Sequence, residues 1–166
     1  PDGQQSYDSA DGTFSWLCPP GVTAVSVVCI GAGGGGGGGQ LGSPYTGGGG
    51  GACAYKNNIS VSPGTSYTVV VGRGGACGAT GAIDGGDSYF NSNTTVMAKG
   101  GQSAGQSGRS GGDALSCVGD AAYYGGSGGA ATYAGSGGQG SATGGSSGSG
   151  HDGGAGGQGG GGGGGH

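Results

Sequence analysis

Two long glycine runs lie close together early in the chain, at residues 33–39 and 47–51, separated by the short insert 40–46. Glycine has no side chain with which to fill the core between helices or strands. Such runs therefore form either flexible linkers or extended, left-handed polyproline-II strands that pack side by side. The strand-forming sequence on both sides favours packed strands, held by the rest of the chain.

Glycine accounts for 55 of the 166 residues, a fraction typical of collagen or of low-complexity disorder. Collagen is excluded because the glycines occur in clusters and pairs without a strict three-residue period, and only 5 prolines are present. Disorder of the whole chain stays open as an alternative, since only 31% of the residues are hydrophobic and 7% are charged.

The charge balance argues against two classes of partner. Four Lys and Arg residues against eight Asp residues give a net charge of -4 without any basic run, so we expect no binding to nucleic acid. No apolar run approaches the ~20 residues that span a bilayer. We therefore expect no membrane insertion.

The first strand pair is predicted around a Cys-Pro-Pro-Gly turn at residues 18–21. This turn lies between residues 13–17 and residues 22–30, and the second range is rich in β-branched residues. The arrangement predicts a hairpin. In the second strand Val25, Val27 and Cys29 share one face and other apolar residues occupy the opposite face, which predicts a central strand covered on both sides.

Two further pairs follow before residue 100. Residues 52–61 and 66–71 flank Ser62-Pro63-Gly64-Thr65, a sequence suited to a type II turn, and predict a second hairpin. Residues 87–90 and 94–99, joined by a polar turn, predict a third pair.

The strand pattern gives way to recurrent Gly-Gly pairs after residue 100. Such density excludes a helix, because each glycine costs about 1 kcal/mol relative to alanine. Polyproline-II strands make no internal hydrogen bonds, so neighbouring strands must stabilise them. We predict a mainly β fold without a helix: a lead-in segment (1–11), a small antiparallel sheet or sandwich base with inserted glycine runs (12–99), and packed polyglycine-II strands (100–166).

The cysteines are odd in number, so at least one is free or pairs between chains. Cys29 lies in an apolar strand and is predicted to be a core residue. Cys53 and Cys77 follow glycine runs and could link neighbouring segments, so a disulfide stays open. No CxxC spacing supports a zinc site.

Residues suited to catalysis or metal binding lack the sequence context that these functions need. His151 and Asp152 lie in low-complexity glycine sequence without a strand-turn-helix nucleophile motif. Asp84 and Asp87 flank a glycine pair, but the calcium-binding nonapeptide does not recur in tandem, so a turn-forming role is favoured. We expect no catalytic residue, no cofactor and no metal.

A particular order of short motifs runs through residues 12–112. The motifs occupy residues 14–16, 20–25, 31–35, 50–54, 61–69, 71–75 and 85–88. In this order they resemble the glycine-rich domain of phage tail-fibre and adhesin proteins. The resemblance implies a small β-rich base followed by packed polyglycine-II strands at a fibre tip, with loops between the glycine runs contacting a cell-surface receptor.

The same resemblance implies that the recognition residues lie in the non-glycine inserts 40–46 and 115–124 and beyond. Tyrosine suits such a role because it combines a broad apolar surface with a hydroxyl at small entropic cost. Alternatively, these tyrosines shield strand ends or pack against a neighbouring subunit. The candidate receptor-binding residues are Leu41, Tyr45, Leu115, Tyr123, Tyr124 and Tyr133.

We therefore expect a non-enzymatic module of a virion surface or of the extracellular space that attaches to a host cell-surface receptor, either a protein or a glycan. It would act as an oligomer or as part of a larger fibre. The alternative is a structural subunit that binds copies of itself and forms a filament or matrix. A third possibility, an ice-binding protein, requires regular G-x-x repeats, which the tail keeps only in patches.

Overall fold

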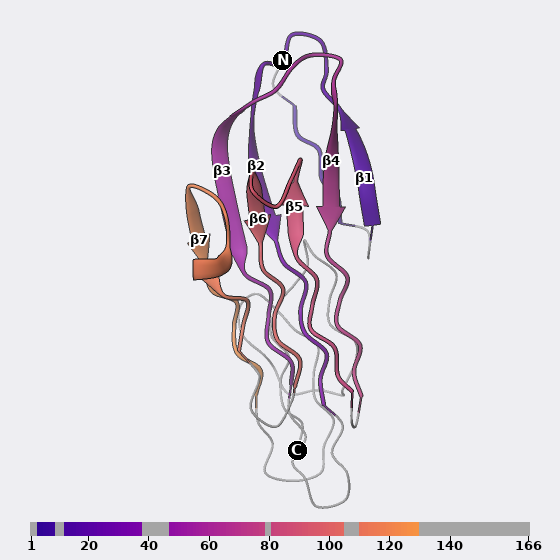
Figure 1. Ribbon diagram of the computed structural model, residues 1–166, viewed down its shortest axis with the longest axis vertical. Helices are drawn as coiled ribbons and strands as arrows, with labels where there is room; N and C mark the ends of the chain where they lie inside the picture. The colour runs from indigo at the N-terminus through magenta and orange to yellow at the C-terminus, as the bar shows by residue number, and fades with distance from the viewer. Residues whose placement is uncertain (1–2, 9–11, 38–46, 79–80, 105–109, 130–166) are drawn as a thin grey trace, which may run out of the picture.

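The computed structural model describes residues 3–8, 12–37, 47–78, 81–104 and 110–129. The predictions for Leu41, Tyr45 and Tyr133 lie outside these ranges. In the described residues the protein is mainly β and contains no α-helix, as predicted. Two small antiparallel sheets lie at one end of the molecule, and glycine-rich segments run from them toward the other end (Figure 1).

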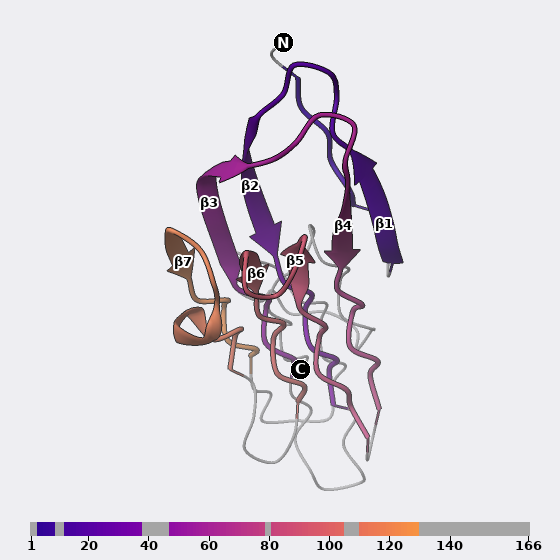
Figure 2. The same cartoon turned by 45° about the horizontal axis from the view of Figure 1, so that its top comes forward.

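The two sheets hold four and three strands. The four-stranded sheet has the order β1 (Gly12–Leu17), β4 (Ser66–Val71), β5 (Ser88–Phe90) and β6 (Val96–Ala98). The three-stranded sheet has the order β2 (Ala24–Ile30), β3 (Cys53–Ser60) and β7 (Ala121–Tyr123). The one-turn 3-10 helix η1 (Ala114–Ser116) precedes β7, and β1 and β7 lie on opposite sides of the molecule (Figure 2).

Residues 12–30 run antiparallel to residues 53–71 as one long ribbon. β1 pairs with β4 and β2 pairs with β3, so the first two predicted hairpins are wrong. The ribbon bends where the Cys18 N–H donates to the Thr65 carbonyl at 2.9 Å, and its two halves lie in different sheets. The glycine-rich stretch 31–52 is therefore the connection that closes this ribbon.

The turn between β3 and β4 has the predicted local chemistry but a different role. Gly64 adopts a φ of +76°, and the Thr65 N–H donates to the Ser62 carbonyl at 3.1 Å, as a type II turn requires. The turn carries the chain from one sheet to the other. Turn chemistry alone therefore predicted where the chain reverses but not which strands pair.

β2 is an edge strand, so the predicted central position is wrong. Val28 on its outer face is 66% exposed, whereas Cys29 on its inner face is buried, as predicted. The third predicted pair is confirmed, because β5 pairs with β6. η1 and β7 were not predicted.

A side-chain core lies between the two sheets. Val96 is fully buried there, and the rings of Trp16, Tyr67 and Phe90 pack together with centroids 5.6 to 5.9 Å apart. These rings supply much of the apolar area that a small sandwich can bury. The buried members of the core are Cys18, Cys29, Ala54, Ile59, Val61, Phe90, Val96 and Ala98.

Seven glycine-rich segments continue the strands away from this core, and we call them the glycine bundle. They are residues 31–37, 47–52, 72–78, 81–87, 99–104, 110–113 and 124–129. Backbone hydrogen bonds join the segments to one another, which supplies the partners that polyproline-II strands lack internally. Of the described glycines only Gly21 and Gly64 have positive φ, so the bundle glycines keep the sign that a left-handed polyproline-II strand needs.

The segment 31–37 lies in the interior of the bundle. Its N–H groups point to different neighbours, from Gly34 to the Gly49 carbonyl at 2.8 Å and from Gly35 to the Ile83 carbonyl at 2.9 Å. Three residues per turn produce this divergence. The long glycine run therefore binds several segments at once.

Glycine is required where these segments approach one another. A Cβ on Gly51 would collide with the Gly31 carbonyl, and one on Gly100 would collide with the Gly85 carbonyl. Cys18, Cys29, Cys53 and Cys117 are free thiols, so Cys53 does not link neighbouring segments through a disulfide. Backbone contacts hold the bundle together.

Candidate functional site

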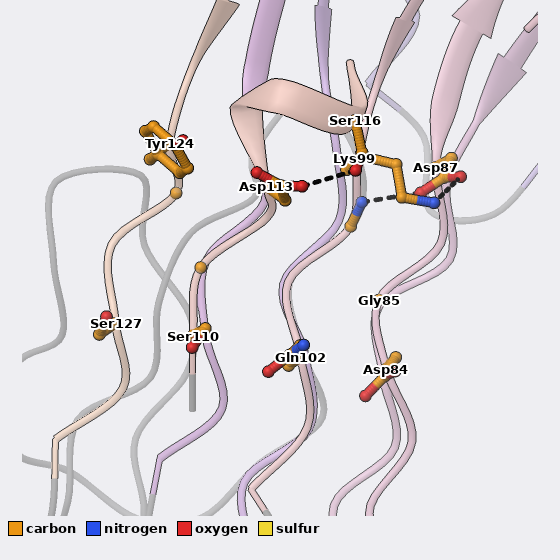
Figure 3. A pocket seen from close by; sticks show the side chains of 13 residues that line it. Asp84, Gly85, Asp87, Lys99, Gln102, Ser110, Asp113, Ser116, Tyr124 and Ser127 are labelled. Atoms are coloured by element: carbon orange, nitrogen blue, oxygen red, sulfur yellow. Dashed lines mark hydrogen bonds and ion pairs between the residues drawn. The ribbon is translucent and has the colours of Figure 1, made fainter. Parts of the chain in front are cut away.

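A polar trough crosses one face of the glycine bundle beside η1 (Figure 3). It is open to solvent and has a volume of about 730 Å³, which is comparable in size to small-molecule sites, about 300–1,000 Å³. Three carboxylates, one ammonium, one amide, three hydroxyls and one phenol line it. They belong to Asp84, Asp87, Lys99, Gln102, Ser110, Asp113, Ser116, Tyr124 and Ser127.

Four copies of one short pattern build the trough. Each copy has two glycines between two larger residues, and the copies are residues 84–87, 99–102, 110–113 and 124–127. Figure 3 shows that each copy contributes one side chain to each of two rows. Asp87, Lys99, Asp113 and Tyr124 form the row nearer the sheets, and Asp84, Gln102, Ser110 and Ser127 form the other row.

Backbone hydrogen bonds fix the order of the four copies across the trough. They run from Gly85 N–H to the Gly101 carbonyl at 2.9 Å, from Gln102 N–H to the Ser110 carbonyl at 3.0 Å, and from Gly125 N–H to the Gly112 carbonyl at 3.1 Å. Hydrogen-bonded extended strands lie about 4.8 Å apart. Each copy is therefore the neighbour of the next copy along the chain.

The spacing of three residues explains why both rows face outward. A Cβ on Gly101 would collide with the Gly49 carbonyl, and one on Gly125 would collide with the Gly50 carbonyl, so these glycines face the bundle interior. A polyproline-II strand has three residues per turn and rises about 3.1 Å per residue. Two positions of each turn pack against other segments, and the third presents a side chain to the trough.

Asp84 and Asp87 connect their own segment to the next one. Asp87 accepts the Gly100 N–H at 2.9 Å through Oδ1 and pairs with Lys99 Nζ at 2.7 Å through Oδ2. Asp84 Oδ1 accepts the Ser103 N–H at 2.6 Å. The predicted turn-forming role is therefore replaced by a bridging role. In the described part of the chain, the other oxygen of Asp84 accepts no hydrogen bond.

Asp113 begins η1 as its N-cap. Its carboxylate accepts the Ser116 hydroxyl at 2.5 Å and the Leu115 N–H at 3.0 Å. These two hydrogen bonds, that of Ser116 first, lower the pKa of Asp113 below its usual value. An ionised carboxylate is thereby fixed in the row of the trough nearer the sheets.

The side chains of the row farther from the sheets face solvent. Gln102, Ser110 and Ser127 are exposed, and in the described part of the chain their side chains make no hydrogen bond. Tyr124, in the row nearer the sheets, is 62% exposed. Hydrogen-bonding capacity and one aromatic face are therefore available to a ligand.

Three of the six predicted receptor-binding residues lie in the described part of the chain. Leu115 in η1 is 86% exposed, Tyr123 at the end of β7 is 59% exposed, and Tyr124 directly follows it. Of these three only Tyr124 lines the trough. The insert 115–124 is not a simple loop between glycine runs, because it contains most of η1 and all of β7.

The other trough residues were not predicted as binding residues. Asp84 and Asp87 were assigned a turn-forming role, and the remaining glycine pairs were interpreted without their polar neighbours. The signal that identifies them is the residue on each side of a pair, as in Lys99 and Gln102 around Gly100 and Gly101. Side chains three residues apart mark all four copies, although the same spacing also occurs at residues 73–76, which do not line the trough.

The described residues contain no group of three or more His, Cys, Asp and Glu side chains that could hold a metal ion. In the same part of the chain, no helix is sufficiently long and apolar to cross a membrane.

Two antiparallel sheets that continue into a bundle of glycine segments define a mainly β, glycine-rich protein. The chain belongs to the glycine-rich domain family, whose model, described as "Glycine-rich domain", matches residues 8–166. No curated protein and no solved structure matches the chain.

Proposed function

We propose that the protein is a non-enzymatic attachment module of a virion surface or of the extracellular space, which contacts a receptor on a host cell. The polar trough carries this proposal. It combines the exposed side chains of Gln102, Ser110 and Ser127 with the exposed ring of Tyr124. Within the described residues, these four side chains make no hydrogen bond to the rest of the fold. Exposed aromatic and polar residues together are typical of recognition surfaces.

The glycine bundle supports this role because it presents the trough on a hydrogen-bonded frame. Segment 99–104 is bonded to the interior of this frame, because the Gly101 N–H donates to the Ala32 carbonyl at 2.8 Å and the Ala52 N–H donates to the Lys99 carbonyl at 2.8 Å. A surface ordered before binding loses less conformational entropy when it binds. The resemblance to glycine-rich domains of phage tail-fibre and adhesin proteins favours the tip of a tail fibre as its place.

Binding of the labelled protein to intact bacterial cells tests the attachment function. We expect saturable binding to some strains of a panel, with competition by unlabelled protein. The double variant Gln102→Ala/Tyr124→Ala, which changes two exposed trough residues, should bind at least tenfold more weakly. Val28→Ala is the control, because Val28 is equally accessible but lies on the outer face of β2.

Circular dichroism and the thermal midpoint of the variants should match those of the original chain, since all three side chains are exposed. A lack of saturable binding on every strain would contradict the attachment function. Equal losses for Val28→Ala and the double variant would also contradict it.

Self-assembly into a filament is the second candidate, and the sheet edges favour it. β1 and β2 are edge strands among the described strands, and they expose Leu17 (62%) and Val28 (66%). Open edges with apolar side chains pair readily with other chains. Electron microscopy of the purified protein should then show long filaments that Leu17→Lys/Val28→Lys abolishes, whereas isolated particles would contradict this candidate.

A further inference from the structure

The two rows of the trough form a grid of short polar side chains beside one aromatic ring. Across its four segments the grid measures about 14 Å, from three spacings of about 4.8 Å. Along each segment the rows are about 9 Å apart, because three residues rise about 3.1 Å each. A short, extended ligand with many polar groups matches this shape.

The charges of the trough select against anionic ligands. Three carboxylates line it against the single ammonium of Lys99, and that ammonium is paired with Asp87 at 2.7 Å. The carboxylates of the trough would repel a phosphate, a sulfate or a sialic acid bound beside them. The ligand is therefore uncharged or weakly cationic.

The uncommitted groups of the trough match alternating hydroxyls and C–H faces. Gln102 offers both a donor and an acceptor, Ser110 and Ser127 offer hydroxyls, and the second oxygen of Asp84 accepts. The exposed ring of Tyr124 offers a flat apolar surface at the edge of this polar field. Sugar rings carry hydroxyls around their rim and C–H groups on their faces, so they satisfy both kinds of group.

Two other ligand classes fit less well. An apolar ligand would leave the carboxylates and the amide of Gln102 without partners, which costs binding energy. A peptide would bring apolar side chains to a trough in which Tyr124 is the one aromatic lining residue, and in its extended form it would pair better with an open strand edge.

We infer that the trough is a binding site for an uncharged oligosaccharide of two or three sugars, with Tyr124 stacked on one ring and the row of Asp84, Gln102, Ser110 and Ser127 bonded to hydroxyls. This inference rests on the proposed function, because it names the chemistry that the attachment module contacts on a cell surface.

Adjacent tyrosines of similar exposure provide a matched test. Tyr124 (62% exposed) lines the trough and Tyr123 (59% exposed) does not. The probes are trisaccharides of glucose, mannose, galactose and N-acetylglucosamine, with sialyllactose as the charged comparison. ¹⁵N-NMR titration of the full chain should show shifts at Gln102, Ser110 and Ser127 for at least one neutral probe.

For that probe, Tyr124→Ala should weaken binding at least tenfold and Gln102→Ala about fivefold, while Tyr123→Ala should change it less than twofold. Sialyllactose should bind at least tenfold more weakly than the neutral probe. The inference is overturned if no neutral trisaccharide shifts the trough amides, or if Tyr123→Ala and Tyr124→Ala have equal effects. Preferential shifts with an extended peptide would overturn it as well.

Cell binding separates this inference from the attachment function. If labelled protein binds cells and the trisaccharides neither bind nor compete, the saccharide inference fails and attachment stands. If a trisaccharide binds the trough and no cell binds the protein, attachment fails and the saccharide site stands.

Discussion

In the sandwich, side chains fill the space between two sheets, whereas in the glycine bundle the backbones themselves fill it. Phe90 and Val96 illustrate the first kind of packing, with 5% and 0% of their surfaces exposed. Gly34 illustrates the second, because its N–H bonds the Gly49 carbonyl at 2.8 Å and a Cβ there would collide with the Gln102 carbonyl. The sandwich is therefore sensitive to lost atoms, and the bundle is sensitive to added ones.

The two regions also differ in what they leave for function. The inward-facing side chains of the sandwich are buried in the core, since their burial drives folding. In the glycine bundle, hydrogen bonds between backbones stabilise the structure. Small residues such as Ala32 and Ala52 are buried there, whereas the longer side chains of the trough face outward. This difference explains why the polar trough lies on the bundle.

Adding one carbon to the bundle should have the largest effect. In Gly101→Ala the new Cβ would collide with the Gly49 carbonyl and displace the backbone of residue 101. Two hydrogen bonds would be disturbed, because the Gly101 N–H donates to the Ala32 carbonyl and the Gly101 carbonyl accepts the Gly85 N–H. We expect a loss of about 3 kcal/mol in the free energy of unfolding. Urea denaturation measures this loss, and faster amide exchange at Gly85 should accompany it.

Gly81→Ala is the control for this change, because a Cβ on Gly81 meets no atom within 4 Å. Its effect should stay within about 0.5 kcal/mol. If both variants unfold at the same urea concentration, close backbone packing does not stabilise the bundle.

Removing carbons from the sandwich should have the next largest effect. Val96→Ala deletes two methyl groups from a fully buried side chain of β6 and leaves a cavity. We expect a loss of about 2 kcal/mol from the lost transfer energy and the cavity together. Val28→Ala, at a position 66% exposed, should be close to neutral in the same denaturation experiment. Equal losses would show that burial between the sheets does not determine stability.

The pH dependence at the trough should be the smallest effect. Hydrogen bonds from Ser116 and Leu115 lower the pKa of Asp113 in the folded chain relative to the unfolded chain. Stability from this group is therefore complete above the unfolded pKa and is lost as pH falls through the folded pKa. The urea midpoint of the original chain, followed from about pH 6 to about pH 2, should fall slightly more than that of Asp113→Asn. Identical pH profiles would contradict this role.

The sequence predicted which residues form strands better than it predicted how the strands pair. β-branched runs such as residues 24–30 identify a strand wherever it pairs, because the preference is local. Pairing of β2 with β3 depends on contacts inside the glycine bundle that close the stretch 31–52. The type II turn at residues 62–65 was right in geometry and misleading in topology, since a turn can join two sheets as well as two paired strands.

The candidate site was predicted only in part. Tyr124 was selected because tyrosine suits recognition, and it lines the trough. Gln102 and Ser110 were not predicted, because the glycines follow no strict three-residue period over the whole chain. The period holds locally, over single turns of segments far apart in sequence. Only folding brings the four copies together into one face.

Eight trough side chains, all but that of Ser116 in η1, occupy the outward third of a backbone turn whose other two places are filled by glycine. Replacing Gln102, Ser110 or Ser127 alters the chemistry of the surface, whereas Asp87 and Asp113 also accept backbone hydrogen bonds that hold the fold. A change of one residue at Gln102 or Ser127 would therefore alter the binding chemistry proposed for the trough without requiring a new fold.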